Sequence, residues 1–339
     1  MVTTRIRRPR LPARARGSLV LALGVVTVIA SAPVTGARTA PGRGTAVASV
    51  AAVLAADPSC TSEPYRARRF DVQALAWSDL YPSRRSSTSA ARPPLDAQGV
   101  PMVRAGDGKR YYSPSGLTFE GLRRLNAWVV KGDPADLELV QRIADRLRLI
   151  AEEQDGVIWL PFLYDKPGQQ VTAPWYNALA QGTALALFSR LHRLLGRSED
   201  LVFARGLFTS LAAFRDGTGP WVAWLDSGRY AWYEHYPAGK RGKILNAHLY
   251  VIVGLRDYWQ QEPTPEARCL LEGAITTMRD RAQHYRVPGS WSYYALRNKV
   301  AYKHYHRFHI GQLRAVGRAS GDAWFTELAA LFVEDFDPG

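Results

Sequence analysis

The chain concentrates its chemically active side chains in one stretch near its carboxyl end, from Tyr293 to Leu313 (YYALRNKVAYKHYHRFHIGQL). Tyrosine, histidine, arginine and lysine alternate there with apolar spacers. Tyrosine and histidine transfer protons, and arginine and lysine bind anions, so this composition predicts a site that handles an anion and moves protons. A surface helix preceded by an exposed loop is the alternative. The apolar residues Phe308, Ile310 and Leu313 favour the site, because they place one face of the segment in the interior.

Spacing within this stretch places its polar side chains on defined faces. In an extended segment, Tyr293 and Arg297 point one way and Tyr294 points the other. The helix that follows repeats polar side chains every three or four residues on one face: Tyr302, Tyr305, His306, His309 and Gln312. Histidines one turn apart also occur in metal sites, but no Asp, Glu or Cys stands beside these to complete a ligand set. We therefore predict no metal.

A second segment, Trp232 to Pro237 (WYEHYP), is followed by three cations: Lys240, Arg241 and Lys243. A Glu, a His and two Tyr beside cations are typical of proton transfer on an anionic substrate. If the segment is extended, Tyr233 and His235 share one face and Glu234 and Tyr236 the other, which favours Glu234 with Tyr236 as the acting pair. A solvated loop with salt bridges is the alternative.

A third segment, Pro174 to Gly182 (PWYNALAQG), opens a predicted helix. Trp175 and Tyr176 offer stacking surfaces and Gln181 offers hydrogen-bonding groups, a combination that suits sugar rings. An ordinary helix start with packing residues explains the same pattern.

Helical periodicity organises the chain from Tyr111 onward and must position these three segments. Apolar residues at spacings of three and four predict helices over Leu117–Val130, Leu137–Ile150, Ala178–Leu195, Leu201–Phe214, Ile244–Trp259, Glu266–Tyr285, Tyr302–Arg318 and Trp324–Phe336. Several pairs are joined by short turns in which Gly ends one helix and a polar residue or Pro starts the next, as at Gly132, Gly196 and Gly321.

A glycine-containing turn that runs into a tryptophan recurs between the pairs, ending at Trp159, Trp221 and Trp291. The recurrence predicts a repeated unit of helix, tight turn, helix and Gly-Trp loop. We expect an all-α fold, an incomplete (α/α) toroid of helix hairpins with short β-hairpin loops at the active-site end. The long loops and the first turns of the inner helices should line a cleft rich in aromatic side chains.

The amino-terminal region predicts export. Residues 1–16 hold six arginines and no acid, an apolar run covers residues 18–30, and Ala30-Ser31-Ala32 is a small-residue cleavage pattern. An uncleaved membrane anchor is the alternative. Removing residues 1–32 lowers the formal charge from +14 by six to +8, which favours an acidic partner. For an exported chain without a nucleic-acid motif, that partner is an acidic polysaccharide or an anionic cell surface, and not nucleic acid.

The expected domain organisation has three parts: a signal peptide at 1–32, a tether and irregular amino-terminal arm at 33–104, and the catalytic toroid at 105–339. The arm should wrap the toroid. The chain has two cysteines, Cys60 and Cys269, and their spacing is compatible both with one bridge and with two free thiols.

At these residues the sequence resembles the D-glucuronyl C5-epimerase family, in its carboxyl-terminal catalytic domain. The resemblance covers roughly Tyr111 to the end of the chain and rests on five ordered motifs: YSPSGL, PWYNALAQG, WYEHYP followed by LN, SYYALR and YHRFHIGQL. It implies catalytic roles for Tyr236, Tyr294 and Tyr305, and a carboxylate-binding role for Arg297. The family usually has a second glutamate where this chain has His235. We keep both Glu234 and His235 as candidate acid/base groups and prefer His235.

The resemblance implies a C5-epimerase that converts D-glucuronate to L-iduronate within a heparosan-like polysaccharide, without a cofactor. The candidate substrate-binding residues are Arg297, Trp175, Tyr176, Gln181, Tyr233, Asn246, His306 and His309. The expected partner is the acidic polysaccharide substrate, and a homodimer stays open. A uronate lyase on the same scaffold and a non-catalytic binding protein are the alternatives. A hydrolase is disfavoured because the motifs lack a pair of catalytic carboxylates.

Overall fold

The computed structural model describes residues 58–74, 76, 93–217, 219–237 and 242–336. The predicted signal peptide, most of the predicted tether and the cations Lys240 and Arg241 lie outside the described residues. No helix within the described ranges is both long and apolar enough to cross a bilayer.

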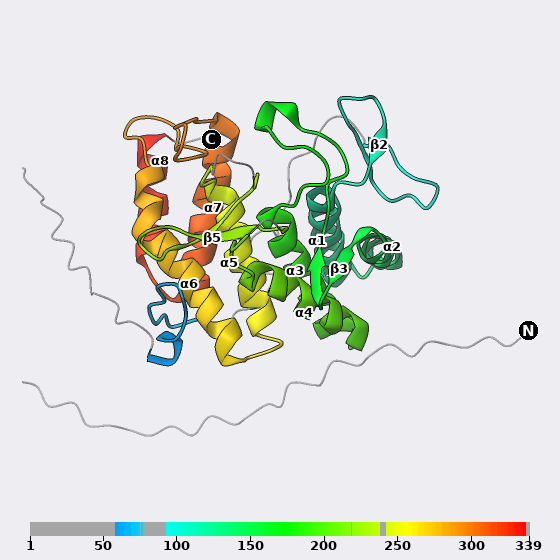
Figure 1. Ribbon diagram of the computed structural model, residues 1–339, viewed down its shortest axis with the longest axis horizontal. Helices are drawn as coiled ribbons and strands as arrows, with labels where there is room; N and C mark the ends of the chain where they lie inside the picture. The colour runs from blue at the N-terminus through cyan, green and yellow to red at the C-terminus, as the bar shows by residue number, and fades with distance from the viewer. Residues whose placement is uncertain (1–57, 75, 77–92, 218, 238–241, 337–339) are drawn as a thin grey trace, which may run out of the picture. The chain divides into compact units, whose positions relative to one another are not determined.

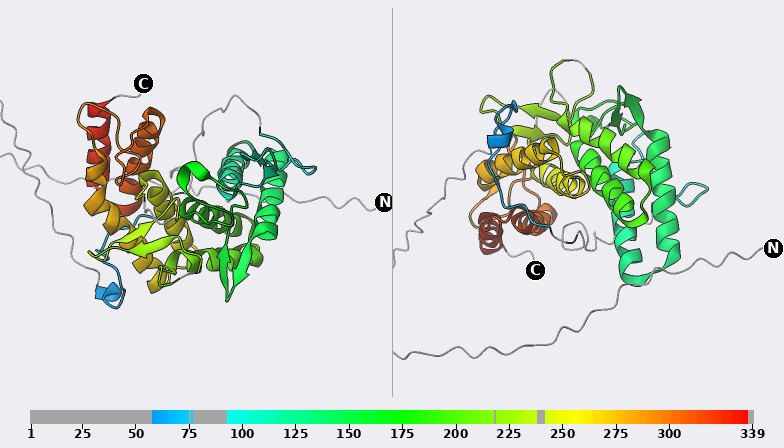
Figure 2. Two further views of the ribbon diagram at one scale, coloured as in Figure 1. Left: turned by 45° about the horizontal axis from the view of Figure 1, so that its top comes forward. Right: turned by 90° about the horizontal axis from the view of Figure 1, so that it is seen from below.

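The described part of the chain folds into helix hairpins, which confirms the predicted incomplete (α/α) toroid. Its helices are α1 (Pro114–Lys131), α2 (Pro134–Ile150), α3 (Ala178–Leu195), α4 (Ser198–Ala212), α5 (Leu245–Trp259), α6 (Pro265–Arg281), α7 (Lys303–Ser320) and α8 (Trp324–Asp335). The odd-numbered helices form an inner row in chain order, and each even-numbered helix packs against its own hairpin partner. Figure 1 shows these elements, and in the right panel of Figure 2 the hairpins follow one another along an arc from α1–α2 to α7–α8.

The helix ends follow the predicted signals. Gly132, Gly196 and Gly321 adopt the left-handed conformation at the ends of α1, α3 and α7, as the Gly turns predicted. Asn177 caps α3, and its side chain accepts a hydrogen bond from the Ala180 amide. Helix α3 begins and ends where the periodicity predicted, and the other predicted helices are off by a few residues at either end.

Short antiparallel strand pairs fill the long connections. They are β1 (Val103–Arg104) with β2 (Arg110–Tyr111), β3 (Glu152–Gln154) with β4 (Val157–Trp159), and β5 (Ala223–Leu225) with β6 (Ala231–Tyr233). The predicted Gly-Trp loop that ends at Trp159 is therefore the β3–β4 hairpin, and the one that ends at Trp221 leads into β5. The third, around Trp291, forms no strand pair among the described residues and is connected by single bridges, such as Tyr293 with Ala301. Short 3-10 helices occur at Pro58–Cys60 (η1), Pro167–Gln169 (η3) and Ala282–Tyr285 (η4).

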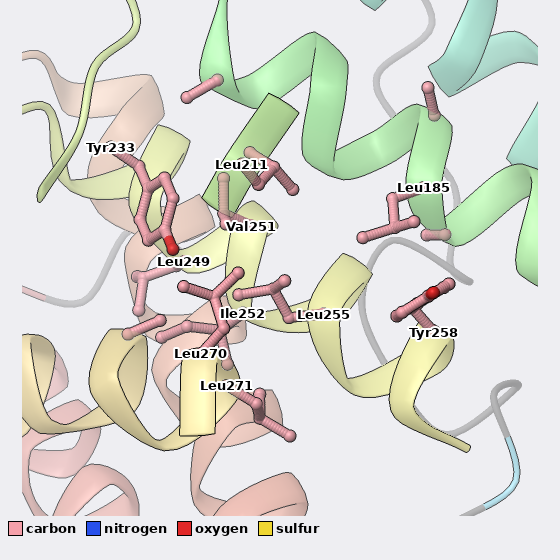
Figure 3. Packing of buried hydrophobic residues seen from close by; sticks show 14 of the residues in the cluster. Leu185, Leu211, Tyr233, Leu249, Val251, Ile252, Leu255, Tyr258, Leu270 and Leu271 are labelled. Carbon is pink, nitrogen blue, oxygen red and sulfur yellow. The ribbon is translucent and has the colours of Figure 1, made fainter. Parts of the chain in front are cut away.

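Helix α5 lies at the centre of the core. Figure 3 shows its apolar side chains against leucines of α3, α4 and α6, and the packed set includes Leu185, Leu211, Leu249, Ile252, Leu255 and Leu271. Nearly every residue of α5 is buried. A helix that is apolar almost all round is buried on all sides, so α5 can serve as a fixed reference for the loops at its first turn.

Helices α3 and α5 approach so closely that their backbones touch. A Cβ atom placed on Gly182 would lie 2.8 Å from the Cα of Val251, and one placed on Gly254 would lie 2.9 Å from the carbonyl carbon of Gly182. Backbone atoms cannot move aside as a flexible side chain can. Glycine is therefore required at both positions for this helix spacing.

The arm runs along α6 and is covalently tied to it. Cys60 and Cys269 form a disulfide, which settles the pairing that the sequence left open. The Phe70 amide donates to the buried Glu272 carboxylate at 3.1 Å, and Arg68 pairs with Asp280 at 2.7 Å.

We predict that Gly254→Ala destabilises the fold, because the added methyl group would collide with the α3 backbone. Overpacking of this kind costs about 1–3 kcal/mol. Gly116→Ala is the matched control, since its added Cβ would meet only the Ser113 side chain, at 3.4 Å, in the first turn of α1. We expect that variant to be neutral or stabilised by up to about 1 kcal/mol. Urea unfolding measures both, and equal stability of the two variants would contradict the close-contact argument.

Candidate active site

The candidate site lies where the first turns of the inner helices α3, α5 and α7 meet three loops. The Ala178 amide at the start of α3 donates to the Glu234 carbonyl at 2.9 Å. The Leu245 amide at the start of α5 donates to the Tyr294 carbonyl at 3.1 Å. The first bond joins the third and second segments singled out in the sequence, and the second bond connects the first segment to the start of α5.

Three tyrosines form the centre of the site: Tyr236, Tyr294 and Tyr305. The Tyr294 hydroxyl lies close enough to the other two phenols to interact with both electrostatically. The rings of Tyr294 and Tyr305 lie 4.4 Å apart between centroids. Tyr236 and Tyr294 pack on apolar side chains at the first turns of α3 and α5. The structure therefore unites the three residues to which the resemblance gave catalytic roles.

Burial keeps these phenols protonated near neutral pH. It raises the pKa of Tyr236 to about 12 and raises the pKa values of Tyr294 and Tyr305 as well. The interaction with Tyr294 offsets part of the rise in pKa for Tyr236 and Tyr305, whereas it raises the pKa of Tyr294 further. Tyr294 is thus the last of the three to ionise.

Lys166 is a site residue that the sequence did not single out. Its Nζ donates to the Tyr236 hydroxyl at 2.9 Å and lies 5.0 Å from the centroid of the Tyr236 ring. The same ammonium group lowers the pKa of Tyr305 against the effect of burial. Lys166 reaches the site because its loop is folded back by Trp175, whose ring stacks on Phe162 at 4.1 Å. A single lysine before Pro and Gly carries no sequence signal of this placement.

His235 lies beside the tyrosines as a neutral imidazole. Its ring is 4.3 Å from that of Tyr236, and it is only partly accessible. Burial, together with the nearby Lys166 charge, lowers the pKa of His235 to about 3. Its Nδ1 atom is buried without a hydrogen-bond partner among the described residues. A neutral imidazole with a free nitrogen is able to accept a proton.

Glu234 points away from the tyrosines and is fully buried. Its carboxylate accepts hydrogen bonds from the Trp224 indole at 3.0 Å and from the amides of Gly242 and Lys243 at 3.0 and 3.3 Å. Burial raises its pKa. The pairing of Glu234 with Tyr236 assumed an extended chain, but β6 ends at Tyr233 and the chain bends at His235 and Tyr236. The bend places these two side chains, and not Glu234, at the tyrosine cluster.

Several predicted binding residues take internal positions. Gln181 is fully buried: its side-chain nitrogen donates to the Ile158 carbonyl at 2.8 Å and its oxygen accepts from the Leu160 amide at 3.0 Å. Tyr233 is fully buried, with its ring 5.1 Å from that of His248. Asn246 is buried in the first turn of α5, and its Oδ1 atom has no partner among the described residues.

Two α7 histidines lie beneath the cluster and are fully buried. The Nδ1 of His306 accepts a hydrogen bond from the Ser292 amide at 2.9 Å. The ring proton is therefore on Nε2, which donates a hydrogen bond to the Phe332 carbonyl at 2.9 Å. The Nδ1 of His309 lies 2.8 Å from the Ser292 hydroxyl, and burial lowers its pKa to about 3. The ring of His309 lies 6.3 Å from that of Tyr305. These histidines support α7 and the Ser292 loop.

The remaining predicted binding residues border the site. Arg297 is exposed, and its amide donates to the Gly242 carbonyl at 3.4 Å, next to the Glu234 loop. Trp175 and Tyr176 line a cavity of about 470 Å³ together with Trp221 and Pro237. The Tyr176 hydroxyl donates to Glu152 at 2.5 Å, and burial raises the pKa of this tyrosine. Pro237 follows Tyr236 directly, so this cavity adjoins the cluster.

Residues 152–334 match the protein family described as D-glucuronyl C5-epimerase C-terminus, a range that contains every site segment described above. Among solved structures, the chain is similar to D-mannose isomerase, with 11% sequence identity and a TM-score of 0.45 over 66% of this chain and 57% of that one. It is also similar to unsaturated glucuronyl hydrolase from Streptococcus agalactiae, with 11% identity and a TM-score of 0.33 over 66% of this chain and 69% of that one. The chain thus spans little more than half the length of the isomerase.

We predict that His235 stays neutral through the physiological range. With its pKa lowered to about 3, its imidazole NMR signals should not move between about pH 5 and pH 8. The His235→Gln variant assigns those signals by their loss. A midpoint near the ordinary histidine pKa of about 6.5 would contradict the buried, neutral state.

Proposed function

Since the chain belongs to the D-glucuronyl C5-epimerase family, whose members are carbohydrate epimerases, we propose that it inverts C5 of D-glucuronate residues within a polysaccharide to give L-iduronate. The observation that carries this proposal is the cluster of Tyr236, Tyr294 and Tyr305 beside Lys166 and a neutral His235.

The reaction requires two proton transfers and no redox change. A base removes the C5 proton, which is weakly acidic because C5 is bonded to the carboxylate carbon, and the electron pair of the C–H bond moves into the carboxylate. An acid then returns a proton to the opposite face of C5 as that electron pair re-forms a C–H bond. A site for this reaction needs a base on one side, an acid on the other and cations near the carboxylate.

The described residues supply groups of each kind. His235 is neutral, because burial lowers its pKa to about 3, so it needs no prior deprotonation before it takes part in proton transfer. Tyr305 and Tyr294 keep their protons and can donate one. Lys166 stabilises negative charge at Tyr236 or at the carboxylate.

The helix arrangement also favours an anion at this position. The first turns of α3, α5 and α7 all adjoin the cluster, and a helix N-terminus carries partial positive charge. Arg297 and Lys166 add full charges at the border. A uronate carboxylate placed among these groups would be bound most strongly when proton removal adds to its negative charge, which is the condition for catalysis.

We propose that the protein is exported, and the disulfide supports this localisation. Disulfides persist mainly in oxidising compartments, and the Cys60–Cys269 bond connects the arm to the toroid. The predicted signal peptide precedes that bond. Amino-terminal sequencing of the mature chain tests the proposal, and a chain that retains residues 1–32 in a reducing compartment would contradict it.

Incubation with a glucuronate polymer in deuterated water tests the proposed reaction. We expect deuterium at C5, iduronate in the product and unchanged chain length. Unsaturated uronate with shortened chains would instead identify a lyase, which shares the first step and then expels the C4 substituent. Polymer binding without any exchange would leave only a binding protein. Tyr305→Phe should lose at least about 10²-fold in exchange rate while it still binds polymer, because it lacks only the hydroxyl proton.

Lys166→Met should lower the exchange rate by about 10²-fold, because the substitution removes a cation from the developing negative charge. It should also move the alkaline limb of the pH–rate profile to higher pH, since Lys166 lowers the pKa of Tyr305. Lys166→Arg, which keeps the charge, is the matched control and should retain most of the activity. Equal losses in both variants would show that Lys166 acts through shape and not through charge.

A further inference from the structure

Helix α7 carries a row of cations that the proposed reaction does not use. Its sequence contains no Asp or Glu. The exposed side chains of the helix are basic: Lys303, His304, Arg307, Arg314 and Arg318. From His304 onward, these exposed residues and the half-buried Gly311 follow one another at spacings of three or four residues. They therefore lie on one face of the helix and form a narrow stripe on its surface. We call His304, Arg307, Arg314 and Arg318 the α7 stripe.

The stripe faces away from the helices that hold α7 in place. The intervening residues, among them His306, His309, Leu313 and Val316, are buried against α5 and α8. Figure 1 shows α7 between these two helices. The stripe is therefore the solvent-facing side of an inner helix and not part of the core.

The two central arginines of the stripe, Arg307 and Arg314, form no ion pair within the part of the chain that the structure describes. Two acids of the α7–α8 turn and of α8 are bound elsewhere: Asp322 pairs with Arg279 at 2.8 Å and Asp335 pairs with Arg286 at 2.6 Å. Like charges along one helix face repel each other, and cations at its first turn oppose the helix dipole. The repulsion around Arg307 and Arg314 destabilises the fold locally, and binding of a polyanion would remove it.

The stripe begins at the candidate site. His304 precedes Tyr305, and their rings lie 4.3 Å apart. At 1.5 Å per residue, the row from His304 to Arg318 extends for about 21 Å from the tyrosine cluster. Gly311 lies halfway along the row and has no side chain, so a ligand can approach the helix backbone there.

We propose that the α7 stripe binds the anionic polysaccharide beyond the reacting uronate, with its cations against successive carboxylates. The inference rests on the proposed function, because that function supplies a polymer that runs through the site. A single narrow row suits an extended chain, whereas a flat anionic membrane would favour a broad basic face. The stripe increases the affinity for the polysaccharide and orients the polymer along α7. It takes no part in proton transfer.

The test compares two double variants of the full chain that lose equal charge. Arg307→Ala/Arg314→Ala removes the centre of the stripe. Arg69→Ala/Arg142→Ala is the matched control, since these arginines are exposed on the arm and on α2 without a partner among the described residues. Binding of heparosan is measured as a function of salt concentration, together with C5 exchange at saturating substrate on heparosan and on a short oligosaccharide.

We expect the stripe variant to bind heparosan about tenfold more weakly at low salt, with a shallower salt dependence, because fewer counterions are released from the polymer. Exchange on the short oligosaccharide should equal that of the wild type, and Arg307→Lys/Arg314→Lys should retain most of the affinity. The control variant should stay within about twofold of the wild type.

Equal weakening in both double variants would show that only net charge matters and would overturn the inference. Loss of binding to phosphatidylserine vesicles with unchanged heparosan affinity would identify a membrane as the occupant and would also overturn it. An absence of C5 exchange in the wild type, with stripe-dependent heparosan binding intact, would instead overturn the proposed function. The two proposals thus fail in different measurements.

Discussion

The backbone contact between α3 and α5 is the constraint on which the rest of the molecule depends. Gly182 and Gly254 let these inner helices meet without intervening side chains, and α5 is buried on nearly all sides as a result. The first turns of both helices are fixed by that contact. The Glu234 carbonyl accepts a hydrogen bond from the first amide of α3, and the Tyr294 carbonyl accepts one from the first amide of α5. The distance between the two helices therefore also sets the distance between the loops that form the site.

The loops then use buried polar groups to hold the tyrosines. The Glu234 carboxylate has no access to solvent, and three hydrogen-bond donors surround it, two of them amides of the returning chain at Gly242 and Lys243. A buried carboxylate is tolerated when it is hydrogen-bonded in this way, and removing its partners would be costly. Glu234 is therefore suited to fixing the loop, which leaves His235 and Tyr236 at the bend to face the other tyrosines.

The electrostatics of the tyrosine cluster follow from burial combined with the Lys166 charge. Burial alone would hold all three phenols far from ionisation and would keep His235 neutral. Lys166 lowers the pKa of Tyr305 and donates a hydrogen bond to the Tyr236 hydroxyl. It comes from a loop that is folded back by the stacking of Trp175 on Phe162. The three tyrosines thus differ in their readiness to ionise although they have the same chemistry, a difference that an acid and a base on opposite faces of a sugar require.

The sequence by itself determined the helices, their turns and the segments that carry chemistry. Helical periodicity depends on which face of each segment is buried, and Gly132, Gly196 and Gly321 end helices for local steric reasons, so both can be predicted without tertiary contacts. The ordered motifs likewise identified Tyr236, Tyr294 and Tyr305. Only the tertiary structure decided which groups surround them: that Lys166 reaches Tyr236, that Glu234 and Gln181 turn inward, and that Cys60 meets Cys269. Those outcomes depend on the distance between helices and on where β6 ends, and no local pattern of residue types encodes either one.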